Sequence, residues 1–263
     1  MTSRTRKIIV GNWKMNPLVL AEAEKLFGKM AQDLSRIKKT DIVVCPPVVY
    51  LNAIFNLLKA MRYKLKPSLG AQDAFWGDVG AFTGEVSASI LYNLGARYVI
   101  LGHSEKRSLG ETNVLINKKV RGALVAGLKP ILCVGESARD ENHNYFSLVK
   151  GQVAECLAGI SKNSISKIIV AYEPIWAIST TANRRNATSG DCREMAIFIR
   201  KVLSDKFGAE SQKVKVIYGG SVNEKDALEF LQNGGVDGLL PGRASLDAEK
   251  FTKIVKICEA LNK

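Results

Sequence analysis

Short apolar runs alternate with stretches of helical period from one end of this chain to the other. The runs are rich in Val, Ile and Leu, as in strands buried on both faces, and the stretches between them repeat apolar residues at spacings of three and four. The helical pattern is clearest over Leu26–Leu34, Leu51–Leu58 and Met195–Leu203, and Asp247 is a predicted N-cap of the last helix. The predicted strands are residues 8–10, 42–44, 69–71, 98–101, 131–134, 168–172, 214–218 and 238–240.

About eight strand–helix units in 263 residues predict an α/β fold of the (β/α)₈ type, a parallel eight-stranded TIM barrel surrounded by helices. A doubly wound open sheet is the alternative, because it is built from the same units. No linker or change in composition divides the chain, so residues 1–263 are expected to form one barrel domain.

The five cysteines form no C-x-x-C pair, and their number is odd. They are expected to be reduced, mostly buried thiols that form neither a disulfide framework nor a zinc site. No apolar run is long enough to span a bilayer, and the basic residues 1–7 lead straight into a predicted strand. These features favour a cytoplasmic protein. The cysteines are Cys45, Cys133, Cys156, Cys192 and Cys258.

The formal net charge of +13 is unusual for a chain of otherwise ordinary composition. Such a charge is compatible with nucleic-acid or membrane binding, but Lys and Arg are spread along the sequence apart from short runs such as Lys38–Lys39 and Arg184–Arg185. A solvated basic surface, with no nucleic-acid and no membrane partner, is the expectation. A positive field would also attract small anionic substrates.

Glu173 follows directly on the apolar run 168–172 and is followed by Pro174. Ligands of parallel α/β folds bind at the carboxyl ends of strands, and a carboxylate half-desolvated there by Ile175 and Trp176 would be a suitable general base. Pro174 gives the departing loop a fixed direction because its φ angle is restricted. The alternative is that Glu173 simply marks the end of a strand.

Other predicted strand ends carry polar residues that a barrel would bring to the same face. Asn12 and Lys14 follow the first strand on one side of an extended segment, and His103 follows the fourth. Glycines at 219–220 and 242 follow the last two strands, where barrels commonly bind phosphate through backbone N–H groups. Each has an alternative: Lys14 as a surface charge, His103 as a hydrogen-bonded core residue, and the glycines as plain turns.

Four segments in this order resemble the signature segments of the triosephosphate isomerase family, and the resemblance covers essentially the whole chain. Residues 70–73 and 82–85 add to it. The four segments are Gly11-Asn12-Trp13-Lys14-Met15-Asn16, Gly102-His103-Ser104-Glu105, Ala171-Tyr172-Glu173-Pro174-Ile175-Trp176-Ala177-Ile178 and Tyr218-Gly219-Gly220-Ser221-Val222.

The resemblance implies interconversion of dihydroxyacetone phosphate and glyceraldehyde 3-phosphate through an enediolate. Glu173 would then move the proton, and His103 would polarise the carbonyl oxygen as a neutral imidazole at a helix start. Lys14 would supply positive charge and Asn12 a hydrogen bond, with Glu105 as a buried ionised partner of Lys14 and His103. Neither a metal nor an organic cofactor is needed, because the proton moves between carbons of one substrate. The phosphate would be bound by backbone N–H groups near Ser179, Ser221, Gly242 and Arg243.

The resemblance also implies a homodimer, in which the loop from Trp76 to Glu85 reaches the partner's active site. Thr83 would approach Asn12 and Lys14 of the partner subunit, and Met15 would contact the partner's loop. The alternative is that the aromatic residues of this region only cover the barrel end of their own subunit. These residues are Phe75, Trp76 and Phe82.

The chain departs from the family pattern in three places. The lid, which normally reads Ile-Gly-Thr-Gly-Lys, is here Ser179–Asn186, about three residues longer and without either glycine. Arg184 or Arg185 would add attraction to the phosphate or remain solvated. Pro241 and Arg243 stand where the family often has valine and a second glycine, and the segment after His103 is slightly shorter.

Two other functions are compatible with the sequence. A barrel whose altered lid does not close would bind phosphate or other anions without catalysis. A binder of nucleic acid or another polyanion is suggested by the charge alone, since the sequence contains no nucleic-acid-binding motif.

Overall fold

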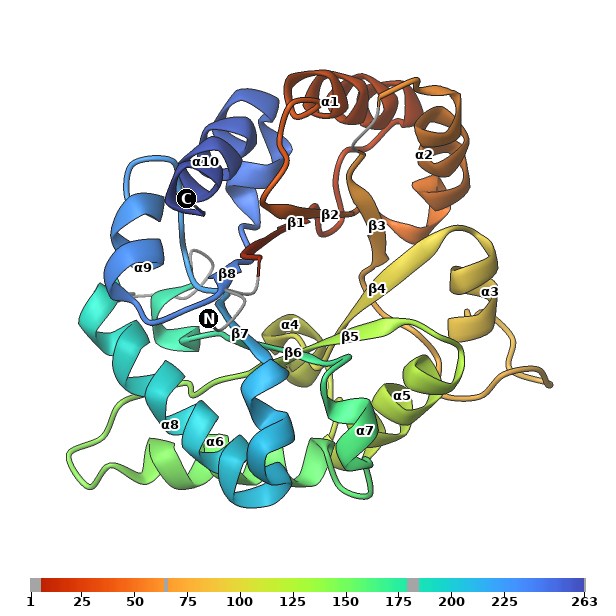
Figure 1. Ribbon diagram of the computed structural model, residues 1–263. Coiled ribbons are helices and arrows are strands. Elements are labelled where there is room, and N and C mark those ends of the chain that lie inside the picture. The colour runs from red at the N-terminus through yellow and green to blue at the C-terminus, as the bar shows by residue number, and fades with distance from the viewer. Residues whose placement is uncertain (1–5, 64–65, 179–184, 263) are drawn as a thin grey trace.

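Eight parallel strands close into a barrel, and the helices surround it (Figure 1). β1 pairs with both β2 and β8, so the predicted (β/α)₈ barrel is confirmed and the open-sheet alternative is wrong. The computed structural model describes residues 6–63, 66–178 and 185–262. The strands are β1 (Ile8–Asn12), β2 (Asp41–Cys45), β3 (Ser68–Ala71), β4 (Ala96–Leu101), β5 (Lys129–Val134), β6 (Ile169–Tyr172), β7 (Lys215–Tyr218) and β8 (Gly238–Leu239).

The helices follow the strands in the order that the sequence pattern predicts. The predicted N-cap of the last helix is confirmed, because the Asp247 carboxylate accepts hydrogen bonds from the backbone N–H groups of Glu249 and Lys250. The α-helices are α1 (Leu20–Asp33), α2 (Val48–Ala60), α3 (Ala88–Asn93), α4 (Ser104–Ser108), α5 (Asn113–Val125), α6 (Asn144–Cys156), α7 (Lys162–Ile165), α8 (Ser189–Phe207), α9 (Ala227–Asn233) and α10 (Ala248–Leu261). Three short 3₁₀ helices are η1 (Ile175–Ala177), η2 (Gly208–Lys213) and η3 (Arg243–Leu246).

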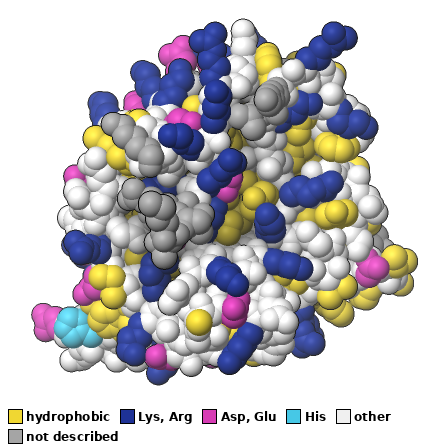
Figure 2. Space-filling model, in the orientation of Figure 1, with side chains coloured by type: hydrophobic (Ala, Val, Ile, Leu, Met, Phe, Trp, Pro, Cys, Tyr) yellow, Lys and Arg dark blue, Asp and Glu magenta, His cyan; other side chains and the backbone are white. Residues whose placement is uncertain are grey.

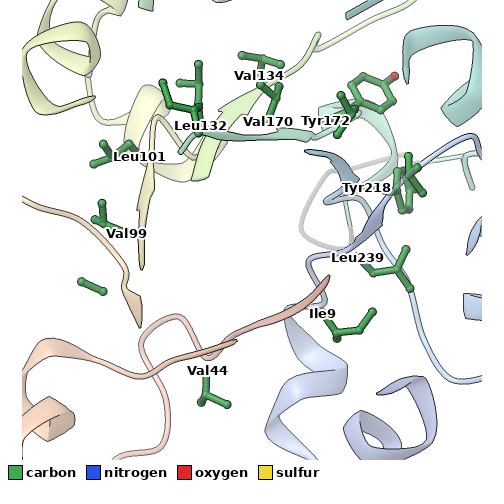
Figure 3. Close-up of a cluster of buried hydrophobic side chains, with 14 of the residues drawn as sticks. Ile9, Val44, Val99, Leu101, Leu132, Val134, Val170, Tyr172, Tyr218 and Leu239 are labelled. Carbon is green, nitrogen blue, oxygen red and sulfur yellow. The ribbon is translucent and has the colours of Figure 1, made fainter. Parts of the chain in front are cut away.

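Alternate residues of each strand build two separate apolar layers. In β6, Ile169 and Ala171 belong to a small cluster inside the barrel, whereas Val170 and Tyr172 belong to the large cluster between barrel and helices. Figure 3 shows members of the outer layer, among them Ile9, Val44 and Leu132, pointing from the strands toward the surrounding helices. Burial on both faces explains why the strands read as nearly continuous apolar runs.

The interior of the barrel is tightly packed at Gly70 of β3. A β-carbon added to Gly70 would lie 2.5 Å from Sγ of Cys45, in β2, and 3.2 Å from Cγ1 of Val43. No side chain fits there unless a neighbour moves, so the glycine is required by the close approach of β2 and β3.

The expectation for the cysteines is confirmed, since all five are free and buried. No helix among the described residues is both long and apolar enough to cross a membrane. On the face shown in Figure 2, Lys and Arg side chains are scattered across the surface and do not gather in one stripe.

Candidate active site

Lys14 reaches the carboxyl end of the barrel from a backbone conformation that the sequence did not predict. Its φ angle is 53°, in the left-handed region, so the expectation of an extended segment after β1 is wrong at this residue. Two hydrogen bonds stabilise the turn: the N–H of Lys14 donates to Oδ1 of Asn12 (3.0 Å), and Nε2 of Gln72 donates to the carbonyl of Lys14 (2.8 Å). The conformation of Lys14 therefore depends both on a local bond to Asn12 and on Gln72, which is 58 residues away in sequence.

His103 is the N-cap of α4, the short helix that follows β4. Its Nδ1 accepts a hydrogen bond from the backbone N–H of Glu105 (3.2 Å). A ring nitrogen that accepts a hydrogen bond carries no proton, so in this geometry the imidazole is neutral and its proton is on Nε2. The ring is buried, with 7 % of the residue exposed.

Glu173 lies directly after β6, and Nε2 of His103 is 3.3 Å from its Oε1. Its Oε2 accepts a hydrogen bond from the backbone N–H of Ser104 (3.0 Å). The residue is 1 % exposed, so the expectation of half-desolvation is wrong: its burial is nearly complete. Burial, followed by the negative charge and hydrogen bond of Glu173, raises the pKa of the neighbouring Cys133 thiol well above its ordinary value.

Glu105 forms an ion pair with Lys14, with 2.6 Å between Oε1 and Nζ. Its Oε2 is 3.7 Å from Nδ1 of His103. The expectation that Glu105 is buried is wrong for this chain, because 45 % of its side chain is exposed. The reason is its position at the rim, where it lines a hollow that no other part of the described chain fills.

A cavity of about 340 Å³ opens between the ends of β1, β7 and β8. Lys14, His103, Ser221, Gly242 and Arg243 all line it, which brings the predicted phosphate-binding segments to the predicted catalytic residues. Ser179, the remaining predicted phosphate ligand, lies outside the described residues. Glu173 does not line this cavity in the present conformation, because its carboxylate is turned toward Ser104.

Hydrogen bonds tie the glycine-rich turn after β8 to the end of β1. The N–H of Asn12 donates to the carbonyl of Pro241 (3.0 Å), and the Ser245 hydroxyl lies within hydrogen-bond distance of the carbonyls of Asn12 (3.2 Å) and Gly242 (2.6 Å). Pro241 therefore contributes its carbonyl, so the missing N–H is not needed at this position. These bonds fix the turn beside Lys14.

A buried carboxylate that was not predicted from the sequence lies beside the site. Glu136, which follows β5, is 0 % exposed, and its Oε1 accepts hydrogen bonds from the Tyr172 hydroxyl and from Nε1 of Trp176, both at 2.8 Å. Burial, followed by the charge of Glu136, raises the pKa of the Tyr172 phenol far above its ordinary value, so Tyr172 remains a donor. Glu136 thus anchors residues on both sides of Glu173, and its position after a strand is the signal that could have identified it.

Arg185 lies away from the predicted phosphate site. Its guanidinium is 4.2 Å from the ring centroid of Trp176, and its Nη2 is 3.7 Å from Oδ1 of Asp191. Of the two outcomes expected for Arg184 or Arg185, the solvated one holds for Arg185, because 60 % of its side chain is exposed although it packs on Trp176. Arg184 and the rest of the lid up to residue 184 lie outside the described residues.

A second hollow lies on the other side of Lys14, and an exposed apolar surface surrounds it. Asn12, Lys14 and Glu105 line this hollow together with apolar residues. The loop from Trp76 to Glu85 projects at the edge of the molecule (Figure 1). The ring of Phe82 packs against that of Phe75, just before the loop, in a tilted arrangement with 4.6 Å between the centroids, but Phe82 remains 43 % exposed. Large apolar side chains with high exposure in this region are Met15, Val48, Val49, Trp76, Phe82 and Leu109.

The described residues contain no group of three or more His, Cys, Asp or Glu side chains placed to hold a metal ion. The groups that the structure does bring together are a carboxylate, a neutral imidazole and an ammonium group, next to a glycine-rich turn. This set can transfer a proton and stabilise a developing oxyanion.

Comparison with known proteins gives one consistent result. Residues 7–258 match the family model described as triosephosphate isomerase. The chain is 42 % identical over 254 residues to a triosephosphate isomerase of Dictyoglomus thermophilum, covering 95 % of this chain and 99 % of that protein. It is 43 % identical over 252 residues to one from Dehalococcoides mccartyi, covering 95 % of each. A crystal structure of triosephosphate isomerase from Bartonella henselae superposes with a TM-score of 0.82 at 34 % identity, covering 96 % of this chain and 98 % of that one.

Proposed function

Since the chain belongs to the triosephosphate isomerase family and is an enzyme that interconverts dihydroxyacetone phosphate and glyceraldehyde 3-phosphate, we propose that Glu173, His103 and Lys14 carry out the reaction. The observation that supports this assignment best is the pairing of Nε2 of His103 with Oε1 of Glu173 at 3.3 Å. A base and a hydrogen-bond donor this close can act on adjacent carbon and oxygen atoms of one small substrate. The reaction belongs to glycolysis and gluconeogenesis.

Glu173 removes a proton from the carbon next to the carbonyl and returns it to the neighbouring carbon. Because the carboxylate accepts a hydrogen bond from the N–H of Ser104, it must turn toward the cavity to reach the substrate. Its nearly complete burial keeps bulk water away from the carboxylate.

His103 donates the proton of Nε2 in a hydrogen bond to the carbonyl oxygen, where negative charge develops. The bond from the Glu105 N–H to Nδ1 fixes the tautomer that this donation needs. Lys14 adds a positive charge close to the same oxygen and to the phosphate, and Asn12 supplies a further hydrogen bond.

The phosphate binds to backbone N–H groups near Ser179, Ser221, Gly242 and Arg243, with Lys14 as the nearest counter-charge. Support comes from the cavity that Ser221, Gly242 and Arg243 line together with Lys14. Backbone amides that converge at a tight turn form a concave site for anions, and a phosphate dianion satisfies them without a metal ion.

We also propose that the enzyme acts as a homodimer through Met15 and the loop around Thr83. The support is the exposed apolar surface around the second hollow: Met15 is 89 % and Leu109 is 82 % exposed in the single chain. A partner loop in this hollow would cover Glu105 and thereby bury its ion pair with Lys14. A cytoplasmic location is proposed on the basis of the five free cysteines.

Replacing Glu173 with Gln tests the catalytic assignment. The amide keeps the size of the side chain but is not a base, so kcat should fall by about 10²- to 10⁴-fold in a coupled assay with glyceraldehyde 3-phosphate. A circular-dichroism spectrum like that of the wild type would show that the fold is retained. An equally active variant would contradict the assignment, and a wild type without activity would favour the alternative of a barrel that only binds anions.

A further inference from the structure

Three cations from three different elements surround the outer part of the active-site cavity. Arg243 begins η3, Lys225 lies between β7 and α9, and Lys250 lies in the first turn of α10. All three line the same cavity as Ser221 and Gly242. They are more than 15 residues apart from one another except for Arg243 and Lys250, so the fold, and not the local sequence, brings them together.

The positive charges of these three side chains are not neutralised by neighbouring carboxylates. None of the ion pairs among the described residues includes Lys225, Arg243 or Lys250, whereas the ammonium group of Lys14 is paired with Glu105. The guanidinium and both ammonium groups are therefore available to a ligand.

The acidic residues of this region have other partners. Asp226 accepts hydrogen bonds from the backbone N–H and the side-chain amide of Asn223 (2.7 and 3.0 Å), and Asp247 caps α10. Among the described residues that line the cavity, Glu224 is the one carboxylate against these cations. The outer part of the cavity therefore has a net positive charge.

A single substrate phosphate does not account for Arg243. The phosphate site proposed above uses backbone N–H groups and Lys14, and the backbone donor of residue 243 would be present with any side chain except proline. A guanidinium at this position adds a planar set of donors that fits two oxygens of a phosphoryl group. Arg243 lies directly after Gly242 and lines the same cavity as Lys225 and Lys250, so its guanidinium adds this capacity next to the phosphate site.

We propose that Arg243, Lys225 and Lys250 form an ancillary subsite for a second phosphoryl group, next to the site for the substrate phosphate. Its ligands are small anions that carry two phosphoryl groups, such as pyrophosphate and bisphosphorylated metabolites. These anions occupy both sites at once and compete with the triose phosphate. This proposal rests on the proposed phosphate site and adds a class of competing ligand to it.

Direct calorimetric titration with inorganic phosphate and inorganic pyrophosphate tests the proposal without relying on catalysis. We expect pyrophosphate to bind the wild type about tenfold more tightly than phosphate, and triose phosphate to displace both. In Lys225→Ala and Lys250→Ala, the affinity for pyrophosphate should fall toward that for phosphate, while the affinity for phosphate changes by less than about threefold.

Lys253→Ala is the matched control, because Lys253 is an exposed lysine of the same helix that does not line the cavity. It should leave both affinities unchanged. Equal affinities of the wild type for the two anions would overturn the subsite, and so would a Lys250→Ala variant that loses phosphate and pyrophosphate affinity in equal proportion. Failure of the proposed function would appear separately, as a wild type that binds phosphate but does not isomerise triose phosphates.

Discussion

At the scale of single residues, hydrogen bonds hold the polar groups of the site in place. The Ser104 N–H holds the Glu173 carboxylate, the Glu105 N–H holds the His103 ring, and Gln72 holds the carbonyl of Lys14. The bonds to His103 and Lys14 orient these groups before the substrate binds, whereas in the proposed mechanism the Glu173 carboxylate leaves the Ser104 N–H to reach the substrate. The burial of His103 and Glu173 makes each such hydrogen bond stronger than it would be in water.

The buried thiol of Cys258 predicts a loss of stability in alkali. Burial raises the pKa of Cys258 from 9.0 to about 11. From pH 9 upward the unfolded chain loses this proton and the folded chain keeps it, so folded-state stability falls by about 1.4 kcal/mol per pH unit until pH 11. Urea unfolding of the wild type and of Cys258→Ala at pH 8 and pH 10.5 measures the effect. The wild type should lose free energy of unfolding at the higher pH through this thiol, whereas Cys258→Ala should not, so the difference between the two proteins should shrink. A constant difference would contradict this prediction.

At the scale of elements, the strands could be predicted from the sequence to within one or two residues, because burial on both faces produces continuous apolar runs. The convergence of the polar residues that follow the strands could also be predicted, because all strand ends of a parallel barrel open on the same face. The left-handed conformation of Lys14 and the exposure of Glu105 could not be predicted. The conformation of Lys14 depends on a contact with a segment distant in sequence, and the exposure of Glu105 depends on whether such a segment covers it. A local sequence pattern contains no information about either.

The packing of β2 against β3 predicts a coupled pair of substitutions. Gly70→Ala should lower the free energy of unfolding by about 1–3 kcal/mol, because its β-carbon would lie 2.5 Å from Sγ of Cys45. Cys45→Ala removes that sulfur, so the double variant should be more stable than the sum of the single changes implies, by about 1 kcal/mol. Unfolding in guanidinium chloride measures the free energy of unfolding of the two single variants and the double variant.

Gly28→Ala in α1 is the control for this pair. A β-carbon there meets no atom within 4 Å, so the substitution should stabilise the helix by about 0.5–1 kcal/mol. Strictly additive effects of Gly70→Ala and Cys45→Ala would show that the contact between β2 and β3 does not determine the cost.

At the scale of the whole molecule, the apolar surface around Met15 predicts a dimer in solution. Sedimentation should give twice the chain mass of 28.7 kDa. Met15→Asp places a charge in the expected interface and should produce a monomer with reduced activity, since Lys14 is the adjacent residue. Val125→Asp, at a similarly exposed valine at the end of α5, should remain dimeric. A wild type that sediments as a fully active monomer would contradict the dimer.

The basic charge of the molecule fits a role in attracting anionic substrates better than a role in nucleic-acid binding. Cations on the face shown in Figure 2 are dispersed, whereas nucleic-acid-binding proteins usually concentrate them in a stripe or along a helix. Attraction of a small dianion needs only a positive potential near the cavity, which Lys14, Lys225, Arg243 and Lys250 provide.

The central claim is that the Glu173 carboxylate transfers a proton between adjacent carbons of one triose phosphate. Isomerisation of dihydroxyacetone phosphate in D₂O, followed by NMR, tests it most directly. The wild type should form glyceraldehyde 3-phosphate that carries deuterium on the carbon next to the carbonyl, and Glu173→Gln should neither isomerise nor exchange protons with the solvent while still binding phosphate. Deuterium incorporation at the wild-type rate in Glu173→Gln would show that another group is the base.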